Sequence, residues 1–227
     1  MNEEAWVGCI DPTPMLEFMQ GKSSDRKMRL FGVACCRRVW HLFTNEQCRE
    51  TVELGERLAD GLVANEERRA AALFGQTQGW YGWFAAGMVL GKPAIESVGL
   101  GSDHAARMVA TANTSQPQIV GNNRRNPRYE PEFYQHMERE RFAQTALLHD
   151  IFGNPFRPIT FAPESRTDTA IAIASQMYES RDFSAMPILA DALQDAGCDN
   201  PDVLNHCRQG GPHVRGCWVV DLVLGKE

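Results

Sequence analysis

Apolar side chains recur at helical spacing through residues 23–43, and this periodicity constrains the fold more than any other feature of the chain. Placed at about 100° per residue, the segment SSDRKMRLFGVACCRRVWHLF carries two adjacent apolar stripes. Ser23 or Ser24 is a suitable N-cap for this helix. We therefore expect a helix buried over about half of its circumference. Its stripes are Met28, Phe31, Cys35, Val39 and Leu42, and Val33, Cys36, Trp40 and Phe43.

Residues typical of helix caps predict where further helices begin in the rest of the chain. Thr13 followed by Pro14 predicts one helix start, Asn45 predicts a second, and Asn200 followed by Pro201 predicts a third. No segment shows the sustained alternation of apolar and polar residues that a half-buried strand requires. The sequence therefore predicts a mostly α fold, an irregular multi-helix bundle of about eight to ten helices.

A polar stretch rich in turn-forming residues separates two groups of predicted helices. Residues 113–128 read NTSQPQIVGNNRRNPR, and we interpret them as an exposed linker. We expect an N-terminal helical lobe over residues 1–112 and a C-terminal helical lobe over residues 129–227. The aromatic residues of the Trp80–Phe84 stretch fall in the first lobe, where core packing is favoured over a pocket lining.

Charge and apolar content argue against nucleic-acid and membrane functions. The net charge is −6, and the arginines at positions 124, 125 and 128 are too few to make a basic field. The most apolar stretch, residues 79–91, is too short for a helix to cross about 30 Å of hydrocarbon. We therefore expect a protein that binds neither nucleic acid nor membrane.

The beginning of the sequence and its cysteines predict the compartment. The start MNEEAWVGCIDP has no basic region and no long apolar run, so it does not have the pattern of a signal peptide. Seven cysteines is an odd number, and their placement lacks the spacing of a small disulfide scaffold. We expect reduced thiols in a cytoplasmic protein.

Five cysteines and histidines near the end of the chain form the candidate metal site. If the last helix begins near His213, its i, i+4 spacing to Cys217 places both side chains on one face. Cys198, His206 and Cys207 complete the set, although the adjacent side chains at 206 and 207 point about 100° apart, so only one of them can easily join.

The competing interpretation treats these cysteines as small core residues. No CxxC pair occurs in the chain. Cys207 lies one turn after Val203, and Cys217 one turn after Val214, in each case on the same predicted helix face. Their spacing favours core packing, with no cofactor, over a zinc site. The chain also has no P-loop, HExxH or GxSxG motif and no strand-linked GxGxxG, so no catalytic residue is predicted.

Two sequence blocks carry a family resemblance. These are SDRKMRLFGVACCRRVWHLF near the start, and DIFGNPFRP followed by PILADALQDAGCDNPDVLNHCRQGGPHVRGCWVVDLVLGK at the end. They resemble a protein family without an assigned activity that is greatly expanded in planctomycete bacteria, whose members occur alone or appended to other modules. The resemblance implies an accessory or interaction module.

Two hypotheses about function follow. The first is a non-catalytic cytoplasmic helical protein that binds another protein, because the layout is helical, the net charge is acidic and catalytic motifs are absent. The alternative is a zinc-binding or enzymatic domain that uses the C-terminal Cys/His cluster.

Overall fold

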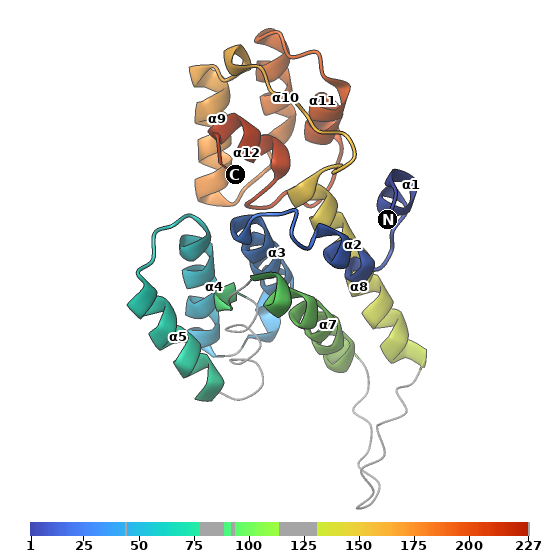
Figure 1. Cartoon of the computed structure of the whole chain (residues 1–227), viewed down its shortest axis with the longest axis vertical. Coiled ribbons are helices and arrows are strands. Elements are labelled where there is room, and N and C mark those ends of the chain that lie inside the picture. The colour runs from blue at the N-terminus through green and yellow to red at the C-terminus, as the bar shows by residue number, and fades with distance from the viewer. Residues whose placement is uncertain (44, 78–88, 92–93, 114–130, 227) are drawn as a thin grey trace, which may run out of the picture. The chain divides into compact units, whose positions relative to one another are not determined.

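The chain folds almost entirely into helices. The computed structural model describes all residues except 44, 78–88, 92–93, 114–130 and 227 (Figure 1). Within this described part the chain forms eleven α-helices and two short 3₁₀ turns, and it forms no strand. The predicted all-α, multi-helix fold is therefore confirmed.

The helices form two compact units that do not follow a single cut in the sequence. The larger unit is Cys9–Thr145, and the smaller unit joins Met1–Gly8 to Ala146–Glu227. The predicted lobes differ from these units, because the first eight residues belong with the C-terminal helices and residues 131–145 belong with the larger unit. Except for Asn113, the predicted linker lies outside the described residues, so the division at that linker stays a prediction.

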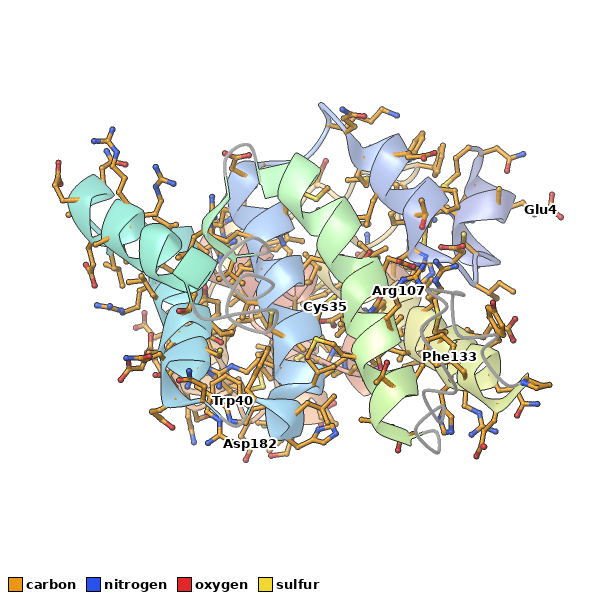
Figure 2. All side chains as sticks on the ribbon, turned by 90° about the horizontal axis from the view of Figure 1, so that it is seen from below. Glu4, Cys35, Trp40, Arg107, Phe133 and Asp182 are labelled. Atoms are coloured by element: carbon orange, nitrogen blue, oxygen red, sulfur yellow. The ribbon has the colours of Figure 1, made fainter. Side chains whose placement is uncertain are left out.

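The larger unit is built around one buried helix, α3 (Asp25–Arg38), which packs against α4 (Glu46–Ala59) and α7 (Ala94–Asn113). Its buried residues run without interruption from Met28 to Cys36, so this part of the helix is buried on all sides and not over half of its circumference as predicted. The helix also ends at Arg38, before the last residues of the predicted stripes. Cys35 and Cys36 are fully buried, and Figure 2 labels the first of them. The remaining elements are α2 (Pro12–Met19), a 3₁₀ turn (Trp40–Leu42), α5 (Asn65–Thr77) and residues 131–145 of α8 (Pro131–Phe152).

Side-chain caps begin these helices, with one departure from the prediction. Ser24 caps α3 and Asn45 caps α4 as expected. The predicted cap Thr13 is wrong, because α2 begins at Pro12 and the Asp11 carboxylate accepts the Thr13 N–H at 2.9 Å. Proline fits the first helical position and aspartate is a strong cap, so this pair fixes the start of the helix.

Two bidentate ion pairs join α3 to neighbouring helices of the larger unit. Arg38 donates to both carboxylate oxygens of the buried Glu140 at 2.8 and 2.9 Å. Arg37 donates to both oxygens of the buried Glu56 at 3.1 Å. Each carboxylate therefore leaves water with its charge compensated by a planar guanidinium, which is the geometry that makes such burial tolerable.

The smaller unit has its own apolar core under short helices. That core includes Leu189, Val203, Val219 and the thiols of Cys198 and Cys207. The contacts run between α9 and α10, α10 and α11, α9 and α12, and α11 and α12. The elements are α1 (Glu3–Val7), residues 146–152 of α8, a 3₁₀ turn (Pro163–Ser165), α9 (Asp168–Ser180), α10 (Met186–Asp195), α11 (Pro201–Arg208) and α12 (Trp218–Leu224).

Several predictions fall on residues outside the described part of the chain. The whole Trp80–Phe84 stretch and the three arginines at 124, 125 and 128 are among these residues, so their predicted roles are untested. Among the helices that the structure describes, none combines the length and the apolar character needed to cross a membrane.

Candidate metal centre

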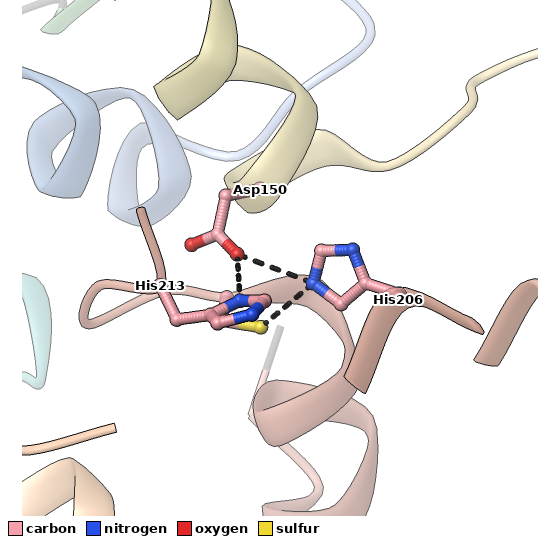
Figure 3. Close-up of side chains that lie close together, drawn as sticks. Asp150, His206 and His213 are labelled. Atoms are coloured by element: carbon pink, nitrogen blue, oxygen red, sulfur yellow. Dashed lines mark hydrogen bonds and ion pairs between the residues drawn. The ribbon is translucent and has the colours of Figure 1, made fainter. Parts of the chain in front are cut away.

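Four potential metal ligands meet in the smaller unit, from three separate segments. Asp150 lies in the last turn of α8, His206 lies on α11, and His213 and Cys217 lie on the connection into α12 (Figure 3). One ligand atom from each side chain lies within 4.8 Å of all the others. This is the only such group of at least three His, Cys, Asp or Glu side chains among the described residues.

The closest distances centre on one carboxylate oxygen. Asp150 Oδ1 is 2.8 Å from His213 Nδ1 and 3.2 Å from His206 Nε2. The same His206 Nε2 is 3.2 Å from Cys217 Sγ. Around a tetrahedral zinc ion, ligand atoms at about 2.0–2.3 Å from the metal are about 3.3–3.7 Å apart. These three distances are close to that geometry, and the shortest needs to open by about half an ångström. The widest separation in the group, 4.8 Å, needs to close by about one ångström.

Asp150 is fixed by backbone as well as by the histidines. Its carboxylate is 3% exposed, and its second oxygen accepts the Val214 N–H at 3.0 Å. Burial acts to raise the pKa of Asp150, but the hydrogen bonds and charges of His206 and His213 outweigh it and hold the pKa below 3.8. The carboxylate is therefore ionised and available as a ligand at neutral pH.

The two imidazoles present different nitrogens to the centre. His206 projects Nε2 from α11, and its ring lies 5.1 Å from the Trp218 ring. His213 projects Nδ1, while its Nε2 is 3.4 Å from the Gln209 carbonyl oxygen. A carbonyl oxygen that accepts a hydrogen bond from Nε2–H keeps the proton on that nitrogen, which leaves Nδ1 free to bind a metal.

The surroundings of His213 favour its protonated form when no metal is bound. Burial acts to lower the pKa of His213, but its hydrogen bond to Asp150, the charge of that carboxylate and the Gln209 carbonyl raise it above 6.5. A proton thus occupies the place between Nδ1 and Oδ1 where a cation would bind. Metal uptake has to displace this proton.

Cys217 supplies a buried sulfur at the start of α12. It is 0% exposed and follows Gly216, whose φ of 94° lies in a region that side chains rarely adopt. Burial raises the pKa of Cys217 well above 9.0, and the charge of Asp150 raises it further. The sulfur is therefore a neutral thiol without a metal, and a bound cation is required to stabilise the thiolate.

The other two predicted candidates lie outside the group. Cys198 and Cys207 are buried members of the apolar core, as the core interpretation predicted for Cys207. Burial, followed by the influence of Cys198 and Asp150, raises the pKa of Cys207 to about 12. At the adjacent positions 206 and 207, only the histidine joins the group, as the helix geometry requires.

The prediction that His213 and Cys217 lie on one face of the last helix is wrong. α12 begins at Trp218, five positions after the expected start, because Gly216 has a φ of 94°, which a right-handed helix cannot contain. His213 and Cys217 are brought together by a turn, in which the Val214 N–H donates a hydrogen bond to Asp150.

Sequence reasoning missed Asp150 altogether. The available signal was an acidic residue in the last turn of a predicted helix, where the helix dipole disfavours a carboxylate. Its neighbours Leu147 and Ile151 are buried, so the same helical face carried both the apolar residues and the acid. A buried acid at that position has to find cationic or hydrogen-bonding partners.

The arrangement does not fit a Cys–His–Asp catalytic triad. In a triad, the histidine contacts the nucleophile with one nitrogen and the acid with the other. Here the single atom His206 Nε2 is 3.2 Å from both Cys217 Sγ and Asp150 Oδ1. In addition, a fully buried thiol with a raised pKa is a poor nucleophile. Convergence of four donors on one point is instead typical of a metal site.

Comparison with known proteins gives no family for the chain. No protein-family model, no curated protein and no solved structure matches it. The resemblance to the planctomycete family therefore stays a prediction.

Proposed function

We propose that this chain is a zinc-binding helical protein in which the ion has a structural role. The ligands are Asp150 Oδ1, His206 Nε2, His213 Nδ1 and Cys217 Sγ. The observation that carries the proposal is the convergence of these four atoms within 4.8 Å in a largely buried site. Thiolate, imidazole and carboxylate donors in a four-coordinate arrangement match the ligand preferences of Zn²⁺.

The charges of the proposed ligands also fit a divalent cation. Asp150 and the Cys217 thiolate supply two negative charges, and the two neutral imidazoles supply none, so a bound Zn²⁺ makes the site neutral overall. A neutral site avoids the free-energy cost of burying an uncompensated charge. This supports zinc over a monovalent ion.

A structural role is supported by the closed ligand set. Catalytic zinc sites keep one position for water or substrate, whereas structural sites fill all four positions with protein atoms. The proposed ion joins the end of α8 to α11 and to the connection before α12, segments that are far apart in the sequence. Such a cross-link offsets part of the entropy that this small unit loses on folding.

Elemental analysis tests the proposal. Protein purified without chelator, or reconstituted with zinc and passed through a desalting column, should retain about one zinc ion per chain. Substitution of Co²⁺ should give the strong visible absorption of a tetrahedral site together with a thiolate-to-cobalt charge-transfer band.

The matched variants are Cys217→Ser and Cys207→Ser. Both remove a buried sulfur from the same unit, but only the first removes a proposed ligand. We expect Cys217→Ser to weaken zinc binding by more than about 100-fold, beyond the loss typical of outer-shell changes, and to abolish the charge-transfer band. Cys207→Ser should bind zinc normally. Wild-type protein that takes up no zinc would overturn the proposal.

The protein-interaction role stays a second prediction about the whole chain. It concerns what the helical scaffold does in the cell, and the zinc proposal concerns what holds the smaller unit together. The two are compatible, because a structural metal can support a surface that binds another protein.

A further inference from the structure

The first eight residues of the chain pack onto the end of α8 within the smaller unit. Their short helix α1 begins with an Asn2 cap, and its Trp6 side chain is 0% exposed. Trp6 Nε1–H donates to the Gly153 carbonyl at 3.0 Å, and the indole lies edge-on to His149 with ring centroids 5.6 Å apart. We call Met1–Gly8 the N-terminal strap.

Polar contacts fix the strap beside the tryptophan. Asn154 donates to the Glu3 carboxylate at 2.7 Å, and Arg157 pairs with the same carboxylate. The Asn154 side chain also accepts the Phe156 N–H at 3.0 Å, which holds the turn after α8 in shape. All of these partners lie between residues 149 and 157, in the last turn of α8 and the chain that follows it.

The same short stretch of chain carries a metal ligand. Asp150 directly follows His149, which touches the strap, and Gly153 closes the helix by donating its N–H to the His149 carbonyl at 2.9 Å. Gly153 has a φ of 61°, and a Cβ there would lie 3.2 Å from the Trp218 ring. That ring in turn lies 5.1 Å from the ring of His206.

Strap and proposed metal site therefore share one structural element. On one side, the last turn of α8 presents the Gly153 carbonyl and the His149 ring to Trp6. On the other side, it presents the Asp150 carboxylate to the histidines. Both sets of contacts require this turn to be folded in the same conformation.

We infer that docking of the N-terminal strap is thermodynamically linked to metal occupancy, so that zinc tightens the strap and the strap tightens zinc. This inference rests on the proposed zinc site. A metal held by Asp150, His206 and His213 fixes the last turn of α8 against α11. Without the metal, the hydrogen bonds of Asp150 to His213 and to the Val214 N–H hold that turn. The strap then binds to a surface that opens more often.

Hydrogen exchange of the full-length protein with and without zinc measures the first half of the linkage. Within the strap, Trp6 N–H donates to the Asn2 carbonyl and Gly8 N–H donates to the Glu4 carbonyl, both at 3.0 Å. We expect zinc to slow exchange of these two amides by about 5-fold or more, the lower end of typical coupling. Amides of α4, in the larger unit, serve as the internal control and should not change.

The pattern of protection separates the two proposals. If zinc protects residues 206–221 but leaves the Trp6 and Gly8 amides unchanged, the linkage is overturned and the zinc site stands. If the protein takes up no zinc and no segment gains protection, both are overturned.

Zinc affinity of strap variants measures the second half. Trp6→Ala should weaken zinc binding by about the same factor by which zinc slows strap exchange, because coupling is reciprocal. Trp6→Phe keeps most of the ring but removes the hydrogen bond to Gly153, so it should give a smaller loss while folding normally. Glu4→Ala is the matched control, since Glu4 lies on the same helix and points into solvent (Figure 2).

A merely structural strap gives a different result. In that case Trp6→Ala lowers the melting temperature by the same amount in zinc and in chelator, and the zinc dissociation constant stays at the wild-type value. Linkage instead predicts a larger drop in melting temperature with zinc present than with chelator. The inference would be contradicted by equal drops in melting temperature with zinc and with chelator, together with an unchanged zinc affinity in both tryptophan variants.

Discussion

Zinc binding to this protein should release protons, because two of the four proposed ligands are protonated when no metal is bound. Burial and the nearby carboxylate raise the pKa of Cys217 well above 9.0, so its thiol has to lose a proton at any physiological pH. The pKa of His213 is raised above 6.5 despite burial, so its ring is protonated at mildly acidic pH. Zinc binding has to displace that proton as well. The pKa of Asp150 is lowered below 3.8, and this carboxylate contributes no proton near neutrality.

The number of protons sets the pH dependence of zinc affinity. At high pH zinc should displace about one proton, that of the Cys217 thiol, and the number should rise as pH falls and the ligands become protonated. Each released proton changes the dissociation constant about tenfold per pH unit, or about 1.4 kcal/mol. Affinity should therefore fall as pH falls, by about tenfold per unit at high pH and more steeply at low pH.

Calorimetry in buffers of different ionisation enthalpy counts these protons directly. A plot of observed enthalpy against buffer enthalpy has a slope equal to the number of protons taken up by the buffer, after correction for zinc–buffer binding. Cys217→Ser should lower the count by about one at every pH, whereas Cys207→Ser should leave it unchanged.

A count near zero at neutral pH would refute this reasoning. It would mean that zinc binds without a thiolate, and so outside the group formed by Asp150, His206, His213 and Cys217. A count that did not rise toward acidic pH would remove His213 from the ligand set.

Two further predictions concern stability, and each can be checked by urea unfolding. Gly153→Ala should destabilise the smaller unit by about 2 kcal/mol, because a left-handed residue gains a Cβ that presses on the Trp218 ring. The control Gly197→Ala has a similar positive φ but nothing within 4 Å, so its loss should be about 1 kcal/mol, and equal losses would contradict the role of the ring. Glu140→Ala should cost about 1–3 kcal/mol, since it leaves its arginine partner on α3 without a carboxylate. A loss below about 0.5 kcal/mol would show that this guanidinium finds water instead.

The helices were predictable because their signals are local. Ser24, Asn45 and Asn200 each cap a helix through a backbone N–H two or three residues away, so the relevant interactions lie within one turn of the sequence. The apolar stripes of α3 follow from a periodicity contained in fewer than twenty residues, whereas its burial on all sides depends on the helices packed against it. The failure at Thr13 is equally local, because Asp11 and Pro12 offered a better cap two residues earlier.

The candidate site was predictable only in part. His206, His213 and Cys217 stood out by residue type, and helix geometry correctly separated positions 206 and 207. Two points could not be read from the spacing. One is that the chain before Trp218 forms a turn and not a helix. The other is that the fourth ligand comes from a segment more than fifty residues earlier.

The sequence by itself determined where the helices lie and which of their faces are apolar, because caps and periodicity act over a few residues. Only the tertiary structure decided that Asp150 meets the two histidines and that Trp6 packs on Gly153. Those contacts join residues about 55 to 150 positions apart. Their formation depends on how whole helices pack, and that packing cannot be predicted from a local pattern in the sequence.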